Sequence, residues 1–236
     1  MRRSSSFLTA ALFSFCAGIA APVFAEQRPV VVELFTSQGC SSCPPADALL
    51  SELSSRKDVI AIAVHVDYWD YIGWQDEFGD PAHAVRQRAY ASKAGRRSVY
   101  TPEMVVNGQT DIVGAKPMAL VEAIAAHKQD TPEMRLDVTR DGERVSITGT
   151  VPRSGPAAME IHVLYVMPEH ATKITKGENR GKTITYSNIA HDWQLASKWD
   201  GQSPLDLSLE MAGDDPVVVL VQAADGGPIL AAARVD

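Results

Sequence analysis

Apolar positions in the first part of the chain form two continuous runs with a helical pattern between them. Val30–Phe35 and Val59–Val66 are rich in β-branched residues, which is typical of buried parallel strands. Between these runs, Ala46–Arg56 carries apolar residues at helical spacing, which predicts an amphipathic helix. A strand, a helix and a strand in this order predict a right-handed βαβ unit.

The pattern continues with two further helices and a hairpin up to about residue 130. Helical spacing predicts helices over Pro81–Lys93 and Pro117–His127. Asn107-Gly108 lies between Met104–Val106 and Gln109–Gly114, and this dipeptide between apolar runs is typical of a β-hairpin turn. The predicted order for this part is therefore βαβαββα.

The second half of the chain is patterned as short strands separated by Pro and Gly. The predicted strands are Arg135–Thr139, Val145–Val151, Met159–Met167, Val217–Gln222 and Ile229–Val235. Only Trp193–Lys198 has a helical character. We therefore expect an α/β domain at 26–130 and an antiparallel β-rich, sandwich-like domain at 131–236.

The first 25 residues have the pattern of a secretory signal peptide. Met1-Arg2-Arg3 is basic, Phe7–Ala21 is apolar but too short to span a bilayer, and Val23-Phe24-Ala25 is a small-residue cleavage site. No other run is long and apolar enough to span a membrane. These features predict a secreted protein, periplasmic or extracellular.

Composition narrows the possible functions. Apolar residues make up 45% of the chain and charged residues 22%, as in ordinary globular proteins. Removal of residues 1–25 would take away two positive charges and change the net charge from −7 to −9, which argues against nucleic-acid binding. The sequence has no phosphate loop, dinucleotide fingerprint, G-x-S-x-G or H-E-x-x-H motif.

The cysteines give the strongest indication of chemistry. Of the three, Cys16 lies in the predicted signal peptide, so Cys40 and Cys43 are the only thiols left in the mature chain. They pair either with each other or with a partner. A bridge between them closes a loop too short to contribute much stability through chain entropy, so a chemical role is the better explanation.

The Cys40-x-x-Cys43 pair follows the first strand and precedes a helix that begins near Pro44-Pro45. The unsatisfied N–H groups at a helix N-terminus stabilise a thiolate and lower the cysteine pKa, in such motifs to roughly 3.5–7.5. We expect Cys40 to be the nucleophile and Cys43 the resolving cysteine. The hydroxyls of Ser41 and Ser42 are potential hydrogen-bond donors to the thiolate.

Two other interpretations of the cysteine pair remain open. In the first, the two thiolates and a histidine such as His65 bind a metal, most plausibly copper. In the second, the disulfide is structural and the protein is a binding scaffold. A zinc site of the usual type is not expected, because the sequence has neither a second Cys pair nor a His-x3–5-His motif.

The order of elements over roughly residues 29–128, together with Cys40-x-x-Cys43, resembles the thioredoxin-like superfamily. In that superfamily a cis-proline faces the dithiol just before the hairpin, and Thr101-Pro102 occupies the matching position. The resemblance implies that the bond before Pro102 is cis and that the Thr101 backbone pairs with an incoming peptide. Gly39 and Ser41-Ser42 differ from the Trp and Gly-Pro of ordinary thioredoxins.

A narrower resemblance extends over nearly the whole mature chain. The stretches that carry it are Glu33–Asp47 (ELFTSQGCSSCPPAD), His65–Asp70, Gly73-Trp74, Tyr100–Pro102 and Gly177–Gly181 (GENRG). They are similar to a secreted thioredoxin-like family of unknown function. This resemblance implies a fold and a redox chemistry, but no substrate.

Several further residues are candidates for the site. Thioredoxins carry a buried carboxylate near the place of Glu33, so Glu33 is expected either to exchange protons with Cys43 or to point outward at a strand end. The residues His65, Asp67, Trp69 and Trp74 lie at or just after the end of the second strand, and they either line a substrate groove or pack in the core. Gly177–Gly181 is either a loop of the β-rich half or a cover over the dithiol.

A basic cluster lies on and after the second predicted helix: Arg86, Arg88, Lys93, Arg96 and Arg97. It is either a solvated helix face or a docking surface for an acidic partner.

The sequence as a whole predicts a secreted thiol–disulfide oxidoreductase. No bound cofactor is expected, because the dithiol is itself the redox centre. The expected partners are a thiol- or disulfide-containing substrate and a second protein that resets the dithiol. The sequence gives neither the direction of the reaction nor an oligomeric state.

Overall fold

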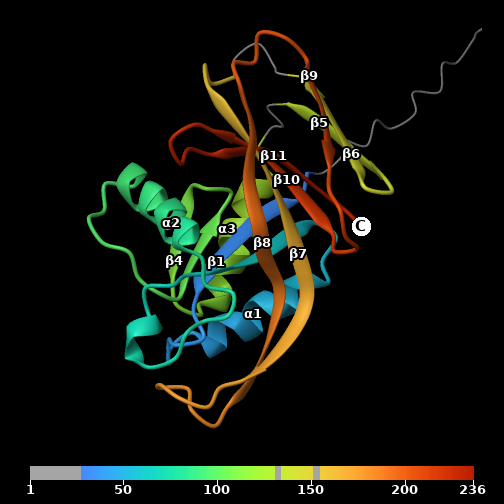
Figure 1. Cartoon of the computed structure of the whole chain (residues 1–236). Coiled ribbons are helices and arrows are strands. Elements are labelled where there is room, and N and C mark those ends of the chain that lie inside the picture. Colours follow the sequence, from blue (N-terminus) through green and yellow to red (C-terminus); the bar gives the residue numbers. More distant parts are fainter. Residues whose placement is uncertain (1–27, 131–133, 151–154) are drawn as a thin grey trace, which may run out of the picture.

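A computed structural model gives the fold, and it describes residues 28–130, 134–150 and 155–236 (Figure 1). The predicted signal peptide lies outside these ranges. The helices are α1 (Pro44–Ser54), α2 (Pro81–Lys93) and α3 (Pro117–Lys128), with a short 3-10 turn at Asp70–Ile72. The strands are β1 (Val30–Thr36), β2 (Val59–His65), β3 (Glu103–Val106), β4 (Thr110–Val113), β5 (Arg135–Asp141), β6 (Arg144–Thr150), β7 (Met159–Lys173), β8 (Thr183–Trp199), β9 (Leu205–Glu210), β10 (Val217–Ala223) and β11 (Ile229–Val235).

The protein is a mixed α/β structure with one large sheet and a smaller antiparallel sheet. The large sheet has eight strands in the order β11-β10-β7-β8-β2-β1-β3-β4, and the small sheet has the order β5-β6-β9. Strand β1 pairs parallel with β2, as the βαβ unit predicts, and β3 pairs with β4 in the predicted hairpin. Strand β1 also pairs antiparallel with β3.

The large sheet continues across the predicted domain boundary at residue 130. Strand β8 pairs parallel with β2 through Ala63 and Ile189, and β7, β10 and β11 extend the sheet beyond it. In Figure 1 the long strands β7 and β8 run past the helical part of the molecule. Four strands of the second half therefore extend the first sheet, and only three form a separate one.

Successive side chains of β1 point to opposite faces of the large sheet, and the helices lie on both faces. Val30, Val32 and Leu34 pack with residues of α1 and α3, whereas Val31 and Phe35 pack with residues of α2. All seven residues of β1 are buried, so the strand is covered on both sides. Each side chain of β1 is thereby directed to one helix layer or the other.

The smaller sheet covers the part of the large sheet that the helices leave open. Val145 and Ile147 of β6 pack against Val217, Val219 and Val221 of β10. Their neighbours Val218 and Leu220 face the α2 side. The small sheet thus lies on the same face as α1 and α3.

Two expectations about the second half are corrected. Trp193–Lys198 is not helical but is the end of the 17-residue strand β8, paired with the beginning of β7. Strand β9 and the first part of β8 are absent from the expected strands, although Leu205, Leu207 and Leu209 of β9 alternate with polar residues as in a half-buried strand.

Candidate functional site

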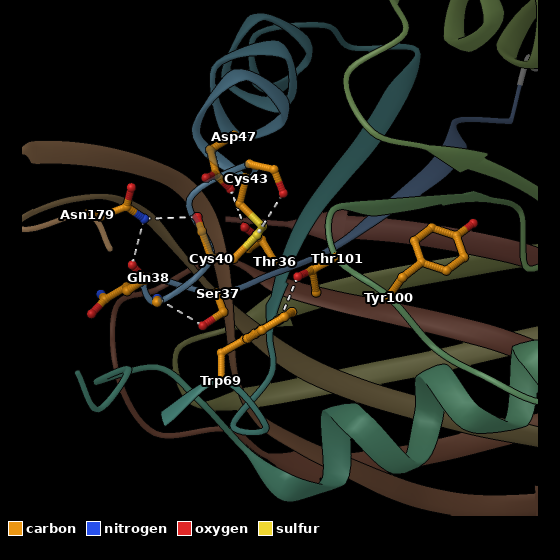
Figure 2. The surroundings of a disulfide bond; sticks show 12 residues. Thr36, Ser37, Gln38, Cys40, Cys43, Asp47, Trp69, Tyr100, Thr101 and Asn179 are labelled. Carbon is orange, nitrogen blue, oxygen red and sulfur yellow. Dashed lines mark hydrogen bonds between the residues drawn. A yellow bond between two sulfur atoms is a disulfide. The ribbon is translucent and has the colours of Figure 1, made fainter. Parts of the chain in front are cut away.

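The site is built around the loop between β1 and α1, where Cys40 and Cys43 form a disulfide (Figure 2). Their Cα atoms are 5.4 Å apart. Cys43 is the N-cap residue of α1, and its carbonyl accepts hydrogen bonds from Ala46 N (2.8 Å) and Asp47 N (3.1 Å). The helix begins at Pro44, immediately after the second cysteine, so the disulfide lies at the positive end of the helix dipole.

The disulfide is almost entirely buried. Cys40 is 3% exposed and Cys43 is fully enclosed, whereas Ser41 and Ser42 between them are exposed. Ser42 Oγ lies 3.4 Å from Cys40 Sγ, which is the hydroxyl contact expected from the sequence. Cys40 is thus the slightly more exposed of the two cysteines.

The residue before Gly39 anchors the loop to the rest of the protein. Gln38 is fully buried, and its backbone N–H donates to Asp76 Oδ2 (2.7 Å). Its side-chain oxygen accepts from Trp74 Nε1 (2.8 Å), and its amide nitrogen donates to Thr172 Oγ1 (3.1 Å) and Glu77 Oε1 (3.2 Å). Half-buried Trp74 is therefore bound to the cysteine loop through Gln38.

The connection between β7 and β8 crosses the cysteine loop. The side-chain amide of Asn179 donates to the carbonyls of Gln38 and Cys40, both at 2.9 Å, and Asn179 is 1% exposed. Gly177 has a φ of +71°, and a Cβ there would lie 3.2 Å from Trp74 Cβ, so the turn requires glycine. Gly177–Gly181 is thus a loop between β7 and β8 that contacts the cysteine loop through Asn179.

On the other side of the loop lies the aromatic segment after β2. A Cβ on Gly39 would contact Trp69 and Ile72 at 3.3 Å, and Trp69 Nε1 donates to Thr101 Oγ1 (2.7 Å). In the view of Figure 2 the disulfide lies between Asn179 and Thr101. Tyr71 stacks on Trp69 and is 80% exposed.

The peptide bond between Thr101 and Pro102 is cis, as the resemblance implies. Pro102 is buried and Thr101 is half-buried. Asp67 is half-buried too, and its carbonyl accepts from Asp70 N in the turn after β2 (3.0 Å). Among the predicted groove residues, Trp69 and Thr101 are hydrogen-bonded to each other, and Trp69 lies against Gly39 of the cysteine loop.

An acid that the sequence did not single out lies below the disulfide. Asp47 is one helical turn after Cys43 and is buried, and Thr36 Oγ1 donates to its Oδ1 (2.7 Å). Burial raises the pKa of Asp47 to about 7, although the charge of His65 and the Thr36 hydrogen bond oppose this shift. The Asp47 carboxyl therefore changes protonation near neutral pH.

His65 belongs to the core, one of the two alternatives considered for it. It is fully buried, its Nδ1 lies 2.8 Å from Asp76 Oδ2, and its ring meets Phe78 and Tyr186 edge-on. Burial acts to raise the pKa of Asp76, but His65 and the donors around it lower the pKa on balance. Asp76 thus links His65 to the cysteine loop through Gln38.

Neither alternative for Glu33 holds, because its side chain is fully buried and lies away from Cys43. Its side chain points to the α2 face, where Arg86 donates to both carboxylate oxygens (2.6 and 3.1 Å) and Tyr90 Oη donates at 2.5 Å. Helix α1 covers the opposite face, with Val32 and Leu34. Glu33 is therefore separated from Cys43 by the sheet itself.

The basic cluster is also divided by these contacts. Arg86 is paired with buried Glu33, and Arg96 is paired with buried Glu103. Arg88, Lys93 and Arg97 are exposed. The five residues thus do not form one continuous basic surface.

The part of the chain that the structure describes has two further properties. None of its helices is long and apolar enough to cross a membrane. Within the same residues, no three His, Cys, Asp or Glu side chains are grouped so that they could hold a metal ion.

Asn179→Ala should destabilise the protein by about 1–3 kcal/mol, because two carbonyls beside the disulfide lose a buried donor. Chemical denaturation measures this change. Lys182→Met is the matched control, since it removes only the bond from exposed Lys182 Nζ to Asn179 Oδ1 (2.8 Å) and should cost less. Equal effects of the two substitutions would mean that Asn179 does not anchor the cysteine loop.

Fold and site together define a mixed α/β protein with a buried Cys-x-x-Cys disulfide at the N-terminus of a helix. The chain belongs to the DUF1223 family, described as proteins of unknown function, and the match covers residues 31–222. This agrees with the resemblance to a family of unknown function.

Two solved structures are similar over most of the chain. Protein AGR_C_4864 from Agrobacterium tumefaciens is 31% identical, with 90% of this chain and 96% of that chain covered and a TM-score of 0.76. HBP35 of Porphyromonas gingivalis is 18% identical, with 89% and 75% covered and a TM-score of 0.62, so it shows likeness of fold alone. No protein with a curated description matches the sequence.

Proposed function

We propose that the protein is an exported thiol–disulfide oxidoreductase that acts through Cys40 and Cys43. The observation that carries the proposal is the disulfide itself, which joins two neighbouring cysteines at the start of α1. A bridge across so short a loop contributes little stability, and a helix N-terminus stabilises the thiolate that disulfide exchange requires. Export is supported by the pattern of residues 1–25.

A thioredoxin-like core over 29–128 is part of this proposal. Support comes from the strand order β2-β1-β3-β4, with α1 and α3 on one face and α2 on the other. The cis Thr101-Pro102 bond, linked to the cysteine loop through Trp69, provides the wall that faces the dithiol in that superfamily.

The proposed reaction is a reversible two-electron exchange. A Cys40 thiolate attacks a substrate disulfide, one substrate sulfur leaves as a thiolate, and a mixed disulfide remains on Cys40. Cys43 then attacks Cys40 Sγ, which forms the Cys40–Cys43 bond and releases the second substrate thiolate. The substrate gains two electrons, the dithiol loses them, and a separate partner resets it.

The substrate, a protein or a small thiol compound, is proposed to approach between the exposed serines and the aromatic segment. Ser41 and Ser42 are exposed beside Cys40, and Trp69 and Thr101 are half-buried next to them. Because Cys40 itself is only 3% exposed, the substrate must present its sulfur on an extended, accessible segment. No bound cofactor takes part in this exchange.

A redox titration tests the proposal. The mature protein is equilibrated in glutathione buffers of stepped potential, free thiols are alkylated, and the Cys40–Cys43 couple is followed by mass, with a metal analysis alongside. We expect a reversible two-electron transition without stoichiometric metal. Cys43→Ser is the matched variant, and it should retain a mixed disulfide with glutathione on Cys40, because no resolving thiol remains.

Two outcomes would contradict the proposal. Tightly bound copper that protects both cysteines from alkylation would indicate a metal-binding module. A disulfide that reducing buffer cannot open while the protein stays folded would indicate a structural role.

A further inference from the structure

We propose that Asp47 takes up the proton of Cys43 during disulfide exchange, and that His65, held by Asp76, is a positioning residue that sets the charge around Asp47. This inference rests on the proposed exchange function. It assigns a proton acceptor to a cysteine that has no access to solvent.

The first support is the position of Asp47 relative to Cys43. The two residues are one turn apart on α1, and Asp47 N donates to the Cys43 carbonyl (3.1 Å). Figure 2 shows the Asp47 side chain beside Cys43 and Thr36. Cys43 has no exposed surface, so a proton leaving its thiol must pass to a buried group before it reaches water.

The second support is that one oxygen of the Asp47 carboxylate, Oδ2, has no hydrogen-bond donor among the described residues. Thr36 Oγ1 donates to Oδ1, whereas Oδ2 is buried and has no hydrogen-bond partner among the described residues. A buried carboxylate oxygen without a donor is costly in a structure that satisfies most of its polar groups. A group that exchanges a proton there gives this oxygen a function.

The third support is the histidine beside it. Thr36 and His65 are paired across the parallel strands β1 and β2, so their side chains lie on the same face of the sheet. His65 Nδ1 is bound to Asp76, and its Nε2 is buried without a partner among the described residues. A carboxylate on one ring nitrogen fixes the orientation of the other.

Ionisable groups from several elements act on Asp47. His65 of β2 favours its ionised form, whereas Asp76, in the loop before α2, opposes it. Tyr186 of β8 interacts with Asp47 and Asp76 and also with exposed Glu77. Burial is the largest effect and raises the pKa of Asp47 to about 7. The carboxylate is therefore free to accept a proton above that pH and is occupied below it.

The proton of Cys43 moves before the disulfide forms. In the mixed disulfide, Cys43 loses its proton to Asp47 and attacks Cys40 Sγ as a thiolate. The Cys40–Cys43 bond forms, the bond from Cys40 to the substrate sulfur breaks, and the substrate leaves as a thiolate that water protonates. In the reverse direction Asp47 returns its proton to Cys43.

The test separates the two steps in time. The reduced protein is mixed with dithiobis-nitrobenzoate, an aromatic disulfide that releases one coloured thiolate when Cys40 attacks and a second when Cys43 resolves. For the wild type, the rate of the second release should rise with pH through about 7, following ionisation of Asp47. Asp47→Asn should slow that release about 100-fold at pH 8 and abolish the inflection, while the first release is unchanged.

A second variant distinguishes an electrostatic role of His65 from a merely structural one, through the pH dependence of the second release. His65→Gln removes the electrostatic interaction that favours ionised Asp47, so the inflection should move to higher pH without disappearing. Glu52→Gln, an exposed acid on the same helix, is the matched control and should leave both releases unchanged. His65→Gln also keeps the inference testable if Asp47→Asn does not fold.

Distinct outcomes overturn the two proposals. If Asp47→Asn, or His65→Gln where the first does not fold, resolves with the wild-type pH profile, Asp47 is not the proton acceptor, although exchange itself stands. If the reduced wild type releases no thiolate at all, the proposed function fails and the role of Asp47 fails with it.

Discussion

Glu33→Gln should destabilise the protein by about 3–5 kcal/mol, because it leaves the Arg86 guanidinium buried beside an uncharged partner. The Glu33 side chain is fully buried and that of Arg86 is 12% exposed. The guanidinium also donates to Tyr90 Oη (2.7 Å) and Gln222 Oε1 (2.9 Å), so one substitution disturbs a network that joins β1, α2 and β10. Urea denaturation at neutral pH measures the loss.

An exposed ion pair provides the comparison for this result. Arg144 Nε on β6 lies 3.3 Å from Glu210 Oε1 on β9, and both side chains are 66% exposed. Glu210→Gln should change stability by less than about 1 kcal/mol. The double variant Glu33→Met, Arg86→Met should be more stable than Glu33→Gln, because no unpaired charge is buried. A Glu33→Gln cost as small as that of Glu210→Gln would mean that water reaches Arg86.

Asp47→Asn should stabilise the protein relative to wild type increasingly as pH rises from about 4 to 8. The folded-state pKa of about 7 exceeds the ordinary value of 3.8, so the native state holds the Asp47 proton more tightly than the unfolded chain does. The stabilisation from this proton is complete below pH 3.8 and is lost as pH rises through 7. The shift corresponds to a change on the order of 4 kcal/mol.

Urea denaturation at a series of pH values compares the two proteins. Asparagine retains an oxygen for the Thr36 hydroxyl and cannot ionise, so the difference in unfolding free energy isolates the titration of Asp47. Glu52→Gln again serves as the control on the same helix and should show no such trend. A difference between Asp47→Asn and wild type that stays constant from pH 4 to 8 would refute a raised pKa at Asp47.

The elements of the first half could be predicted from the sequence because they depend on local patterns. The runs that became β1 and β2, the helical spacing of α1 to α3 and the Asn107-Gly108 turn are all contained in short windows. The joining of the two halves depends instead on the pairing of Ala63 with Ile189, residues more than 120 positions apart. Nothing in either strand's own pattern specifies that partner.

The site was predictable in part for the same reason. Cys40-x-x-Cys43 and Thr101-Pro102 are local motifs. Glu33 was misplaced because β1 is apolar on both faces, so its sequence carries no alternation from which to assign a side chain to α1 or α2. Asp47 is the last residue of the Glu33–Asp47 motif, and its position one helical turn after Cys43 could have indicated that it lies near the dithiol.

Asn179 illustrates a third limit. The sequence offered two roles for Gly177–Gly181, and only the course of the long strands β7 and β8 brings Asn179 to the carbonyls of Gln38 and Cys40. A contact across about 140 residues depends on the length and bend of a hairpin, which local propensities do not determine.

The joint between β2 and β8 has a consequence for how the chain can be divided. A fragment ending near residue 130 would keep β1 to β4 but would expose the backbone of β2 along the line where β8 pairs with it. Such a fragment would expose the apolar edge of β2, and natural proteins cover such edges because an exposed one recruits further strands. We therefore expect the fragment to self-associate more readily than the whole chain.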